Sequence, residues 1–498
     1  MKKYIIILFS AMLITSCGND WLEQYPHSSL SDEQAILSLR DAQIAVTGIY
    51  NGTKGAGFYG REIFVAADVC SEDVVLRTDN SNRYVANYRW QLQAGISSSI
   101  WTTGYTVIHR ANEVLKRLPA LNLVPGETEE QRNQLLGEAY FMRAMIHFEI
   151  IKFYAQPYNF TNDASHLGIP YMLEPSREND VARETVKVCF DNIIKDAEEA
   201  LTLMNIDKQS DPYAAGKDVV NAFLARLYLY MAGPSNGAYY AKAKDYAEIV
   251  INSGRYRLAT AAEYEIKGGG VAGNPYVSEM WGPSSGYSME SIFTIAYKDV
   301  SGERNQTDAL GRIYLDKSKA YGDLLSSVQI QDLVGYNDEN NKDVRKSMLY
   351  TYDGKVAVRK FMGDGSVSWD LSNINIFRIS EMYLIAAEGW AKGTSRDEGK
   401  ALAHLNSLRT KRGLSALNDL IGSNLTDEIL RERRRELCFE GHGLIDHKRL
   451  NTSIVRTADP VNPENPNLGM VYPNNFFALG IPSGELNVNK LIVQNPGY

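Results

Sequence analysis

Aromatic side chains in polar, glycine-rich stretches are the residues of this sequence best suited to chemistry, and that chemistry is ligand binding. A sugar site needs flat apolar faces beside groups that hydrogen-bond hydroxyls, and tyrosine and tryptophan supply both. Two or three such rings predict weak capture, with a Kd on the order of 1 mM to 1 µM. Each ring could also be a loop anchor packed on the protein. The candidate ligand-binding residues are Tyr84, Tyr88, Trp90, Tyr276, Trp281, Tyr287 and Trp369.

The patterns that could carry catalysis or metal chemistry are weaker. The 60 acidic residues guarantee that carboxylate pairs can be found. A glycosidase pair, however, must be held about 5–10 Å apart with one raised pKa, which spacing along a chain does not show. His442 and His447 flank Asp446 with a spacing that can bind zinc. We nevertheless expect no catalytic residue, no metal site and no cofactor, apart from a structural calcium ion that residues 337–341 could hold.

A glycine pattern near the middle of the chain is a false nucleotide motif. Gly268, Gly270 and Gly273 match GxGxxG. The motif requires a helix directly after it. Pro275 and the Gly/Ser run that follows supply none, so we reject nucleotide binding.

The first seventeen residues have the pattern of a lipoprotein signal. Two lysines precede the apolar run at 4–13, and Ile14-Thr15-Ser16 leads to Cys17. That run is too short to cross a bilayer core of about 30 Å. We expect residues 1–16 to be a signal peptide and Cys17 to be the lipidated residue. Acyl chains gain about 0.8 kcal/mol per buried methylene, so they would hold an otherwise soluble chain on a membrane.

Charge and cysteine usage exclude other classes. A formal net charge of −8 argues against a nucleic-acid partner. The run 431–436 (RERRRE) mixes arginine with glutamate, and we expect it to be a solvated helix face. Cys70, Cys189 and Cys438 each lie among apolar residues. An odd, sparse set of this kind predicts small buried side chains rather than a disulfide framework.

The elements that must position the candidate residues are amphipathic helices that occur in pairs. Apolar residues recur at i, i+3, i+4 and i+7 in the helical segments, and glycines stand where they should end, at 233, 254, 393 and 413. The segments are 220–231, 243–251, 379–390, 395–412, 132–154, 185–204 and, opened by Thr426, 427–440. The stretch around Trp101 is also helical, and core packing explains that ring at least as well as binding.

The fold class that follows is mainly α. Alanines and glycines lie where paired helices need to approach, as in tetratricopeptide hairpins, although there is no strict 34-residue period. We expect about four degenerate hairpins forming a curved scaffold, with long irregular loop regions and a few short strands. The loops cover 52–99, 259–357, which includes the strand-like 291–297 (SIFTIAY), and 453–498. Loops of that length are usually functional.

A single domain over 17–498 accommodates these elements. We divide it into a mostly helical part at 17–260, a loop-rich insertion with short strands at 261–370, and C-terminal helices with an extended tail at 371–498. No linker separates these parts in the sequence.

Short motifs occur along the chain in a fixed order. They are Glu138–Ala144 with His147-Phe148, Gln156-Pro157-Tyr158, Leu167–Pro170, Arg378–Leu384, Arg433–Leu437, Phe439–His442, Asp446–Leu450, Ile481-Pro482 with Glu485, and Gln494–Tyr498. With these motifs in this order, the sequence resembles the SusD/RagB family of outer-membrane lipoproteins of Bacteroidetes. The resemblance runs from Cys17 to the last residue.

The resemblance implies a role as well as a fold. Members are anchored in the outer membrane, face outward, and cover a SusC-like TonB-dependent transporter. They bind oligosaccharides or polysaccharides, or in some members peptides, and they are not enzymes. We therefore expect a glycan-binding, cell-surface lipoprotein that delivers its ligand to such a transporter. The alternatives are a RagB-like peptide-binding member and, less favoured, a surface glycoside hydrolase.

The lipid anchor can be tested at one atom. Cys17→Ala removes the thiol that would carry the acyl chains, so we expect a soluble, mislocalised product, measured by fractionating cells and probing membrane and soluble fractions. A variant that stays in the membrane fraction as the parent does would contradict the anchor.

Overall fold

The computed structural model describes residues 36–175, 180–205, 212–269, 274–282, 287–297, 309–362, 372–462 and 468–498. These residues are mainly helical, as predicted. No helix in these ranges is both long and apolar enough to cross a membrane. The α-helices are α2 (Leu39–Gly52), α3 (Glu62–Asp68), α4 (Val85–Tyr88), α5 (Ser98–Arg117), α6 (Glu129–Tyr154), α7 (Val186–Leu203), α8 (Lys217–Ala232), α9 (Gly237–Asn252), α10 (Ala261–Tyr264), α11 (Leu310–Tyr314), α12 (Val328–Leu333), α13 (Ile379–Lys392), α14 (Glu398–Lys411), α15 (Gly422–Leu437), α16 (Gly443–Leu450) and α17 (Ser483–Val488).

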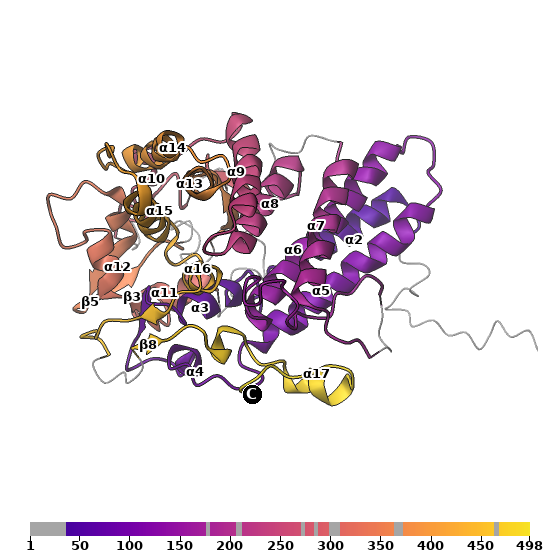
Figure 1. The fold of residues 1–498 in the computed structure, drawn as a ribbon, viewed down its shortest axis with the longest axis horizontal. Helices are drawn as coiled ribbons and strands as arrows, with labels where there is room; N and C mark the ends of the chain where they lie inside the picture. The colour runs from indigo at the N-terminus through magenta and orange to yellow at the C-terminus, as the bar shows by residue number, and fades with distance from the viewer. Residues whose placement is uncertain are drawn as a thin grey trace, which may run out of the picture.

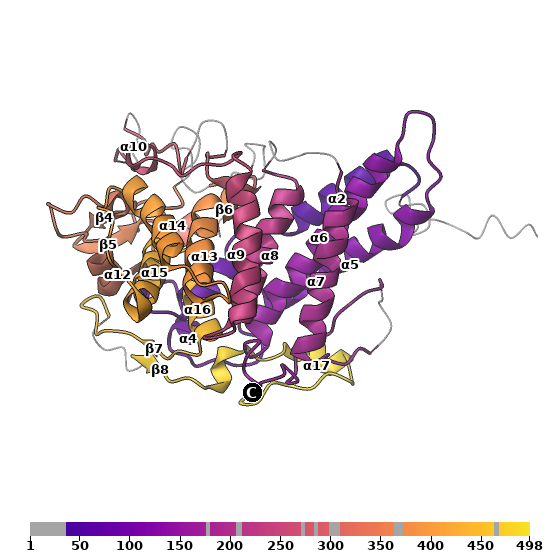
Figure 2. The ribbon, with the colours of Figure 1, turned by 45° about the horizontal axis from the view of Figure 1, so that its top comes forward.

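The long helices form a row of packed neighbours. α2 packs on α5, α6 on α7, α8 on α9 and α13 on α14, and α13 also packs on α9. Figure 2 shows this row running from α5, α6 and α7 through α8 and α9 to α13 and α14. In Figure 1, α4 and α17 lie below these helices, on either side of the C-terminus. The expected scaffold of paired helices is confirmed.

Local sequence signals set most helix ends. α6 begins with a capping box, in which Thr128 accepts from the backbone of Gln131 and the Gln131 side chain accepts from the backbone of Thr128. α8 ends at Ala232, directly before Gly233, whose φ is +58°. α9 ends two residues before Gly254, whose φ is +68°. Glycine reaches this left-handed region without strain, so it stops a helix there.

Glycines also set how closely the helices approach. A Cβ on Gly104 of α5 would lie 2.7 Å from Cδ1 of Ile150 in α6. A Cβ on Gly389 of α13 would lie 2.7 Å from the carbonyl oxygen of Tyr240 in α9. The expectation that small residues stand at the helix contacts is therefore confirmed at two of the interfaces.

The strands that the structure describes are short and pair only in twos, always antiparallel. The predicted strand at 291–297 is present as β2. The pairs are β1 (Val74–Leu76) with β3 (Leu324–Ser326), β2 (Ser291–Ile295) with β6 (Ile374–Arg378), β4 (Leu349–Tyr352) with β5 (Lys355–Val358), and β7 (Ile454–Val455) with β8 (Gly469–Met470). Three 3₁₀ helices span Leu118–Ala120, Val344–Met348 and Asn475–Phe477.

Helix predictions were wrong in two respects. The regions 52–99, 259–357 and 453–498 were expected to lack helices, but they contain α3 and α4, α10 to α12, and α17, respectively. The seven residues of α3 are all buried and therefore show no amphipathic period. The helix expected over 427–440 runs instead over Gly422–Leu437. Thr426 is not its N-cap, because its hydroxyl donates back to the carbonyl of Ser423 at 2.8 Å inside the first turns.

The run 431–436 is not a solvated helix face, which corrects a third expectation. Glu432 and Glu436 are 0% exposed, and Arg433 and Arg435 are also buried. Arginine and glutamate almost never enter a core unless they are paired. Here each meets partners from distant parts of the chain, which no local pattern could show.

Glu436 of α15 is the centre of a buried ion-pair network. One carboxylate oxygen lies 2.6 Å from Arg378 and 2.8 Å from Arg412, and the other lies 3.1 Å from Arg345. Glu290 pairs with the same Arg378 and Arg412 from the opposite side. These arginines hold the pKa of Glu436 well below its usual range despite the burial.

The network joins segments that are distant in sequence. Arg378 ends β6, Arg412 follows α14, and Arg345 lies in the 3₁₀ helix Val344–Met348. Arg378 also makes a two-pronged contact with Glu440, at 2.8 and 2.6 Å. The paired helices and the irregular middle of the chain are thereby fixed to one another.

Removing the central carboxylate tests this arrangement. Glu436→Gln leaves three buried guanidinium groups with too little negative charge, so we expect a loss of about 3–5 kcal/mol in the free energy of unfolding, measured by urea titration. Arg431→Gln is the matched control on the same helix. Its side chain is 58% exposed and pairs with Glu428 at the surface, so it should change stability by less than about 1 kcal/mol. Equal, small effects of both substitutions would contradict the central role of Glu436.

Candidate ligand-binding pocket

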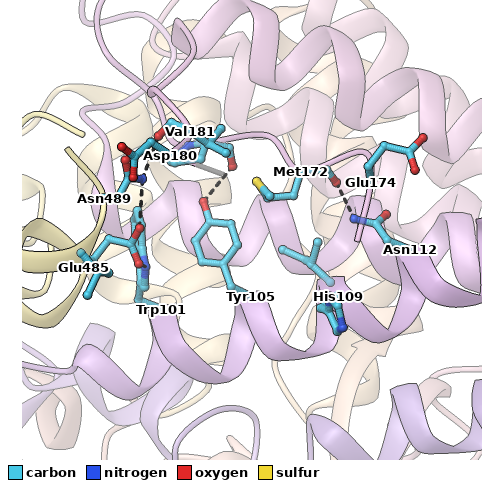
Figure 3. A pocket seen from close by; sticks show the side chains of 13 residues that line it. Trp101, Tyr105, His109, Asn112, Met172, Glu174, Asp180, Val181, Glu485 and Asn489 are labelled. Carbon is cyan, nitrogen blue, oxygen red and sulfur yellow. Dashed lines mark hydrogen bonds between the residues drawn. The ribbon is translucent and has the colours of Figure 1, made fainter. Parts of the chain in front are cut away.

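A pocket of about 320 Å³ lies between α5, the segments 170–174 and 180–181, and α17 (Figure 3). Pockets that bind small ligands span about 300–1,000 Å³. Two other cavities lined by described residues have volumes of about 40 and 10 Å³. The pocket is lined by Trp101, Tyr105, Ile108, His109, Asn112, Pro170, Met172, Glu174, Asp180, Val181, Glu485, Val488 and Asn489.

The floor of the pocket is one face of α5. Trp101, Tyr105 and His109 follow one another at intervals of four residues, and Figure 3 shows them side by side along the helix. Trp101 is 2% exposed and packs edge-on against Tyr154, so it offers little of its ring. Tyr105 is half-buried and is the main aromatic surface of the floor.

Tyr105 also fixes one wall. Its hydroxyl donates to the carbonyl oxygen of Pro170 at 2.7 Å. Burial raises the pKa of Tyr105 well above its ordinary value, so the phenol keeps its proton at neutral pH and continues to donate.

An arginine of α6 holds the same wall from behind. Arg143 pairs with both oxygens of Asp196 on α7, at 2.7 and 2.6 Å. It also donates to Asn112 Oδ1 at 2.9 Å, and Asn112 in turn donates to the carbonyl of Met172 at 3.0 Å. The amide at the edge of the pocket is therefore fixed in one orientation.

A buried histidine completes this support. His147 Nε2 accepts from the backbone N–H of Met172 at 3.1 Å, and its Nδ1 lies 2.9 Å from the carbonyl of Arg143. The first contact requires an unprotonated Nε2, and the second is satisfied by a proton on Nδ1. Burial lowers the pKa of His147 to about 3, which keeps the ring in this neutral form. The ring stacks on Tyr171 with centroids 3.9 Å apart.

The opposite wall is α17, near the C-terminus. Glu485 accepts from Trp101 Nε1 at 3.4 Å and from Asn489 at 3.1 Å. Asn489 also donates to the carbonyl of Val181 at 2.9 Å. These bonds tie α17 both to the floor and to the segment at 180–181.

The segment that carries α17 is bound to the end of α6. The last carbonyl groups of a helix have no partner inside it. The backbone N–H of Leu479 donates to the carbonyl of Phe153 at 2.7 Å. Asn495 donates to the carbonyls of Tyr154 and Leu479, at 2.8 and 2.7 Å. Two of the open carbonyls of α6 are thereby satisfied by the last twenty residues of the chain.

A buried lysine satisfies one more of these carbonyls, together with that of Ala155 directly after the helix. Lys448 of α16 donates to the carbonyls of Lys152 and Ala155 and is 0% exposed. Burial, aided by repulsion from Lys152, lowers the pKa of Lys448 to about 7. The amine has protons to donate whether it is charged or neutral, so the contact persists on either side of that pH.

Four of the rings proposed from the sequence as binding surfaces are buried in the structure, and their role in binding stays a prediction. The guanidinium of Arg456 lies 4.3 Å from the ring centre of Tyr88 and 4.0 Å from that of Trp90. Trp90 Nε1 also donates to the carbonyl of Cys70 at 3.2 Å. Both rings are in contact with this internal arginine, so neither offers a face to a ligand in this conformation.

Tyr276 and Trp281 are likewise internal. They are 4% and 8% exposed. Trp281 packs edge-on against Tyr264 with centroids 5.4 Å apart, and Lys360 lies 4.9 Å from its ring centre. Trp281 lies beside the Glu436 network, with the guanidinium of Arg378 5.5 Å from its ring centre, whereas Tyr276 packs against Tyr350.

Two more of the sequence candidates, Tyr84 and Tyr287, are not part of the pocket lining. Tyr84 is half-buried and donates to Glu62 at 2.8 Å. Tyr287 is 39% exposed and meets Tyr213 edge-on. Trp369 and the proposed lipidation site Cys17 lie outside the described residues.

The histidines that resembled zinc ligands are bound by other side chains. His447 Nε2 lies 3.0 Å from Glu72, and Asp446 pairs with Arg433 and Arg449. In the described ranges, no group of three or more His, Cys, Asp or Glu side chains is arranged to hold a metal. The structural calcium ion at residues 337–341 stays a prediction.

The three cysteines behave as predicted. Cys70, Cys189 and Cys438 are buried and free. Burial raises the pKa of each thiol to about 12, so none is a reactive thiolate at neutral pH.

The pocket residues were missed because the sequence signal was interpreted as packing. For Trp101, core packing was judged at least as good an explanation as binding, and Tyr105 and His109 continue the same helical spacing. A row of aromatic and polar residues at i, i+4 and i+8 beside Asn112 is the signal that could have indicated a lined groove. Glu485 stood in a family motif but had no assigned role.

Comparisons with known proteins decide the family. A sequence profile described as "Starch-binding associating with outer membrane" matches residues 20–229, and one described as "SusD family" matches residues 326–498. The chain belongs to the SusD/RagB family. SusD-like protein P2 of Formosa agariphila is 26% identical and is aligned over the full length of both chains.

Solved SusD structures share the fold. A SusD superfamily protein from Bacteroides thetaiotaomicron is 27% identical, with a TM-score of 0.79 over 92% of this chain and 100% of that one. A structure described as a laminarin-binding SusD-like protein is 18% identical, with a TM-score of 0.66 over 93% of this chain and 100% of that one. The mainly helical architecture described above is thus the SusD-like fold.

The contact between the C-terminal segment and α6 can be tested at Asn495. Asn495→Ala leaves the buried carbonyl of Leu479 without its donor and leaves that of Tyr154 only the longer contact with Arg183, at 3.4 Å. We therefore expect a loss of about 1–3 kcal/mol in the free energy of unfolding by urea titration. Lys490→Ala is the control, because Lys490 is exposed in the same segment and should have no effect above about 0.5 kcal/mol. An Asn495→Ala variant as stable as the control would contradict the capping role.

Proposed function

We propose that this protein is a non-catalytic glycan-binding lipoprotein of the outer membrane, and that the pocket between α5 and α17 takes part in holding the glycan. The observation that carries this proposal is the composition of the pocket. It combines a half-buried tyrosine ring and aliphatic side chains with amide and carboxylate groups at its edge.

This composition suits a sugar. The ring of Tyr105, together with Met172, offers an apolar surface to the C–H face of a pyranose. Glu174 and Asp180 stand at the rim, where carboxylate oxygens can accept hydrogen bonds from hydroxyls. The fixed walls reduce the ordering that a ligand would otherwise have to induce.

The comparisons with known proteins also support glycan binding. A matching profile carries starch binding in its description, and one structural relative is described as binding laminarin. Those descriptions concern the other proteins. The proposal for this chain rests on them together with the pocket.

The proposed partner is a SusC-like TonB-dependent transporter. Family resemblance supports a lid-like role, in which the protein captures a glycan outside the cell and releases it toward the transporter. The proposed anchor at Cys17 would place the protein at the membrane surface that this role requires. Weak, reversible capture suits a protein that must release what it binds, and turnover of a bound glycan by the purified protein would contradict the non-catalytic role.

A change at the pocket floor tests glycan binding. Tyr105→Leu keeps apolar bulk but removes the aromatic face, so we expect affinity for a bound polysaccharide to fall about two- to tenfold. The measurement is isothermal titration calorimetry with a panel of soluble polysaccharides that includes starch and laminarin.

Tyr352→Ala is the matched control, because Tyr352 is 38% exposed and lies on β4, away from the pocket. Its affinity should equal that of the parent. Circular dichroism melts of both variants separate lost binding from lost folding. No heat of binding with any polysaccharide, or a Tyr105→Leu variant that folds and binds as the parent does, would contradict the proposal.

A further inference from the structure

The charges around the pocket are unbalanced. Three carboxylates, Glu174, Asp180 and Glu485, belong to its lining. Among the described lining residues there is no lysine or arginine, and His109 is the one side chain that could carry positive charge. Figure 3 shows Asp180 and Glu485 at the Trp101 end of the pocket and Glu174 at the His109 end. A ligand lying along the floor would therefore meet negative charge at both ends.

None of these three carboxylates is paired with a described cation. Glu174 and Asp180 are exposed, and neither forms an ion pair with a described residue. Glu485 is hydrogen-bonded by the indole of Trp101 and the amide of Asn489, which are both neutral donors. None of the three is neutralised by the contacts that the structure shows.

The two described arginines beside this wall are engaged elsewhere. Arg143, behind the wall, makes a two-pronged ion pair with Asp196. Arg183 is buried and donates to the carbonyls of Gly168 and Val493, and its side chain is not part of the lining.

The other side chains that line the pocket indicate the chemistry of the uncharged part of the ligand. Tyr105, Ile108, Met172 and Val181 are apolar or aromatic. An aromatic face beside carboxylates attracts a cation through both the ring and the charges. The same carboxylates repel a ligand that carries negative charge, so they select by exclusion as well as by attraction.

We propose that the pocket selects amine-bearing sugars, namely oligosaccharides that contain hexosamine units with free, protonated amino groups, over neutral sugars and over uronic acids. This inference rests on the proposed glycan-binding function, and it names the glycan class that this pocket prefers. The ammonium groups would meet Glu174 at one end and Asp180 with Glu485 at the other, while the sugar ring lies against Tyr105.

Three tetrasaccharides of different charge test the proposal on the purified protein. They are a β-1,4-linked tetramer of glucosamine, its N-acetylated form, and a tetramer of galacturonic acid. We expect affinity by calorimetry to fall in that order. The glucosamine tetramer should also bind more weakly as salt rises from about 0.1 M to about 1 M, because the Debye length then shrinks from about 10 Å to about 3 Å.

The double variant Glu174→Gln with Asp180→Asn removes the two exposed charges while keeping the shape of the rim. We expect its affinity for the glucosamine tetramer to fall about three- to tenfold, while its affinity for the N-acetylated tetramer changes less than about twofold. Glu339→Gln removes an exposed carboxylate outside the pocket and should change neither value.

The outcomes separate this inference from the function on which it rests. If the glucosamine tetramer binds no better than its N-acetylated form, or if the double variant leaves its affinity unchanged, the inference is overturned and glycan binding stands. Equal binding of a lysine tetrapeptide would overturn the assignment to sugars. If no tetrasaccharide and no polysaccharide binds, the proposed function fails as well.

Discussion

The end of α6 is the constraint on which the candidate site depends. A helix that ends inside a protein leaves carbonyl groups without partners, and each unpaired group costs about 1–3 kcal/mol. Here the donors come from Lys448, Leu479 and Asn495, far along the chain. The C-terminal segment is held against α6 by this need, and α17 is thereby placed beside α5. The pocket exists because two segments more than 300 residues apart meet at one helix end.

A second constraint fixes the rest of the molecule. The network around Glu436 buries several arginines and glutamates. The free energy lost when such charges leave water offsets much of the free energy gained from their attraction. The main effect of the network is therefore to fix the relative positions of the segments that it joins. Because each arginine must pair with its carboxylates, β6, α14 and α15 can pack in only one arrangement. The paired helices supply the bulk of the apolar core, and the buried charges determine how the irregular segments attach to it.

Sequence reasoning succeeded where local physics decides the outcome. Helices with one apolar face and glycine stops, such as the segment ending at Gly233, were predicted close to their true bounds. It failed where partners come from elsewhere in the chain. The run 431–436 gives no local sign of burial, and α3, buried on every side, has no periodic pattern. For the site, the polar residues flanking Trp90 indicated that this ring was accessible, but Arg456, which is distant in sequence, covers it. Tyr105 has the pattern of an ordinary helix residue, and only the position of α17 beside α5 makes it part of a pocket.

The central claim is that the space between α5 and the C-terminal segment is a glycan site. A crystal structure of the protein with a bound oligosaccharide tests it most directly. The account predicts electron density for sugar against Tyr105, with hydroxyl or amino groups within hydrogen-bonding distance of Glu174, Asp180 or Glu485. Density for the sugar on another surface, with the space between α5 and α17 holding only water, would contradict it.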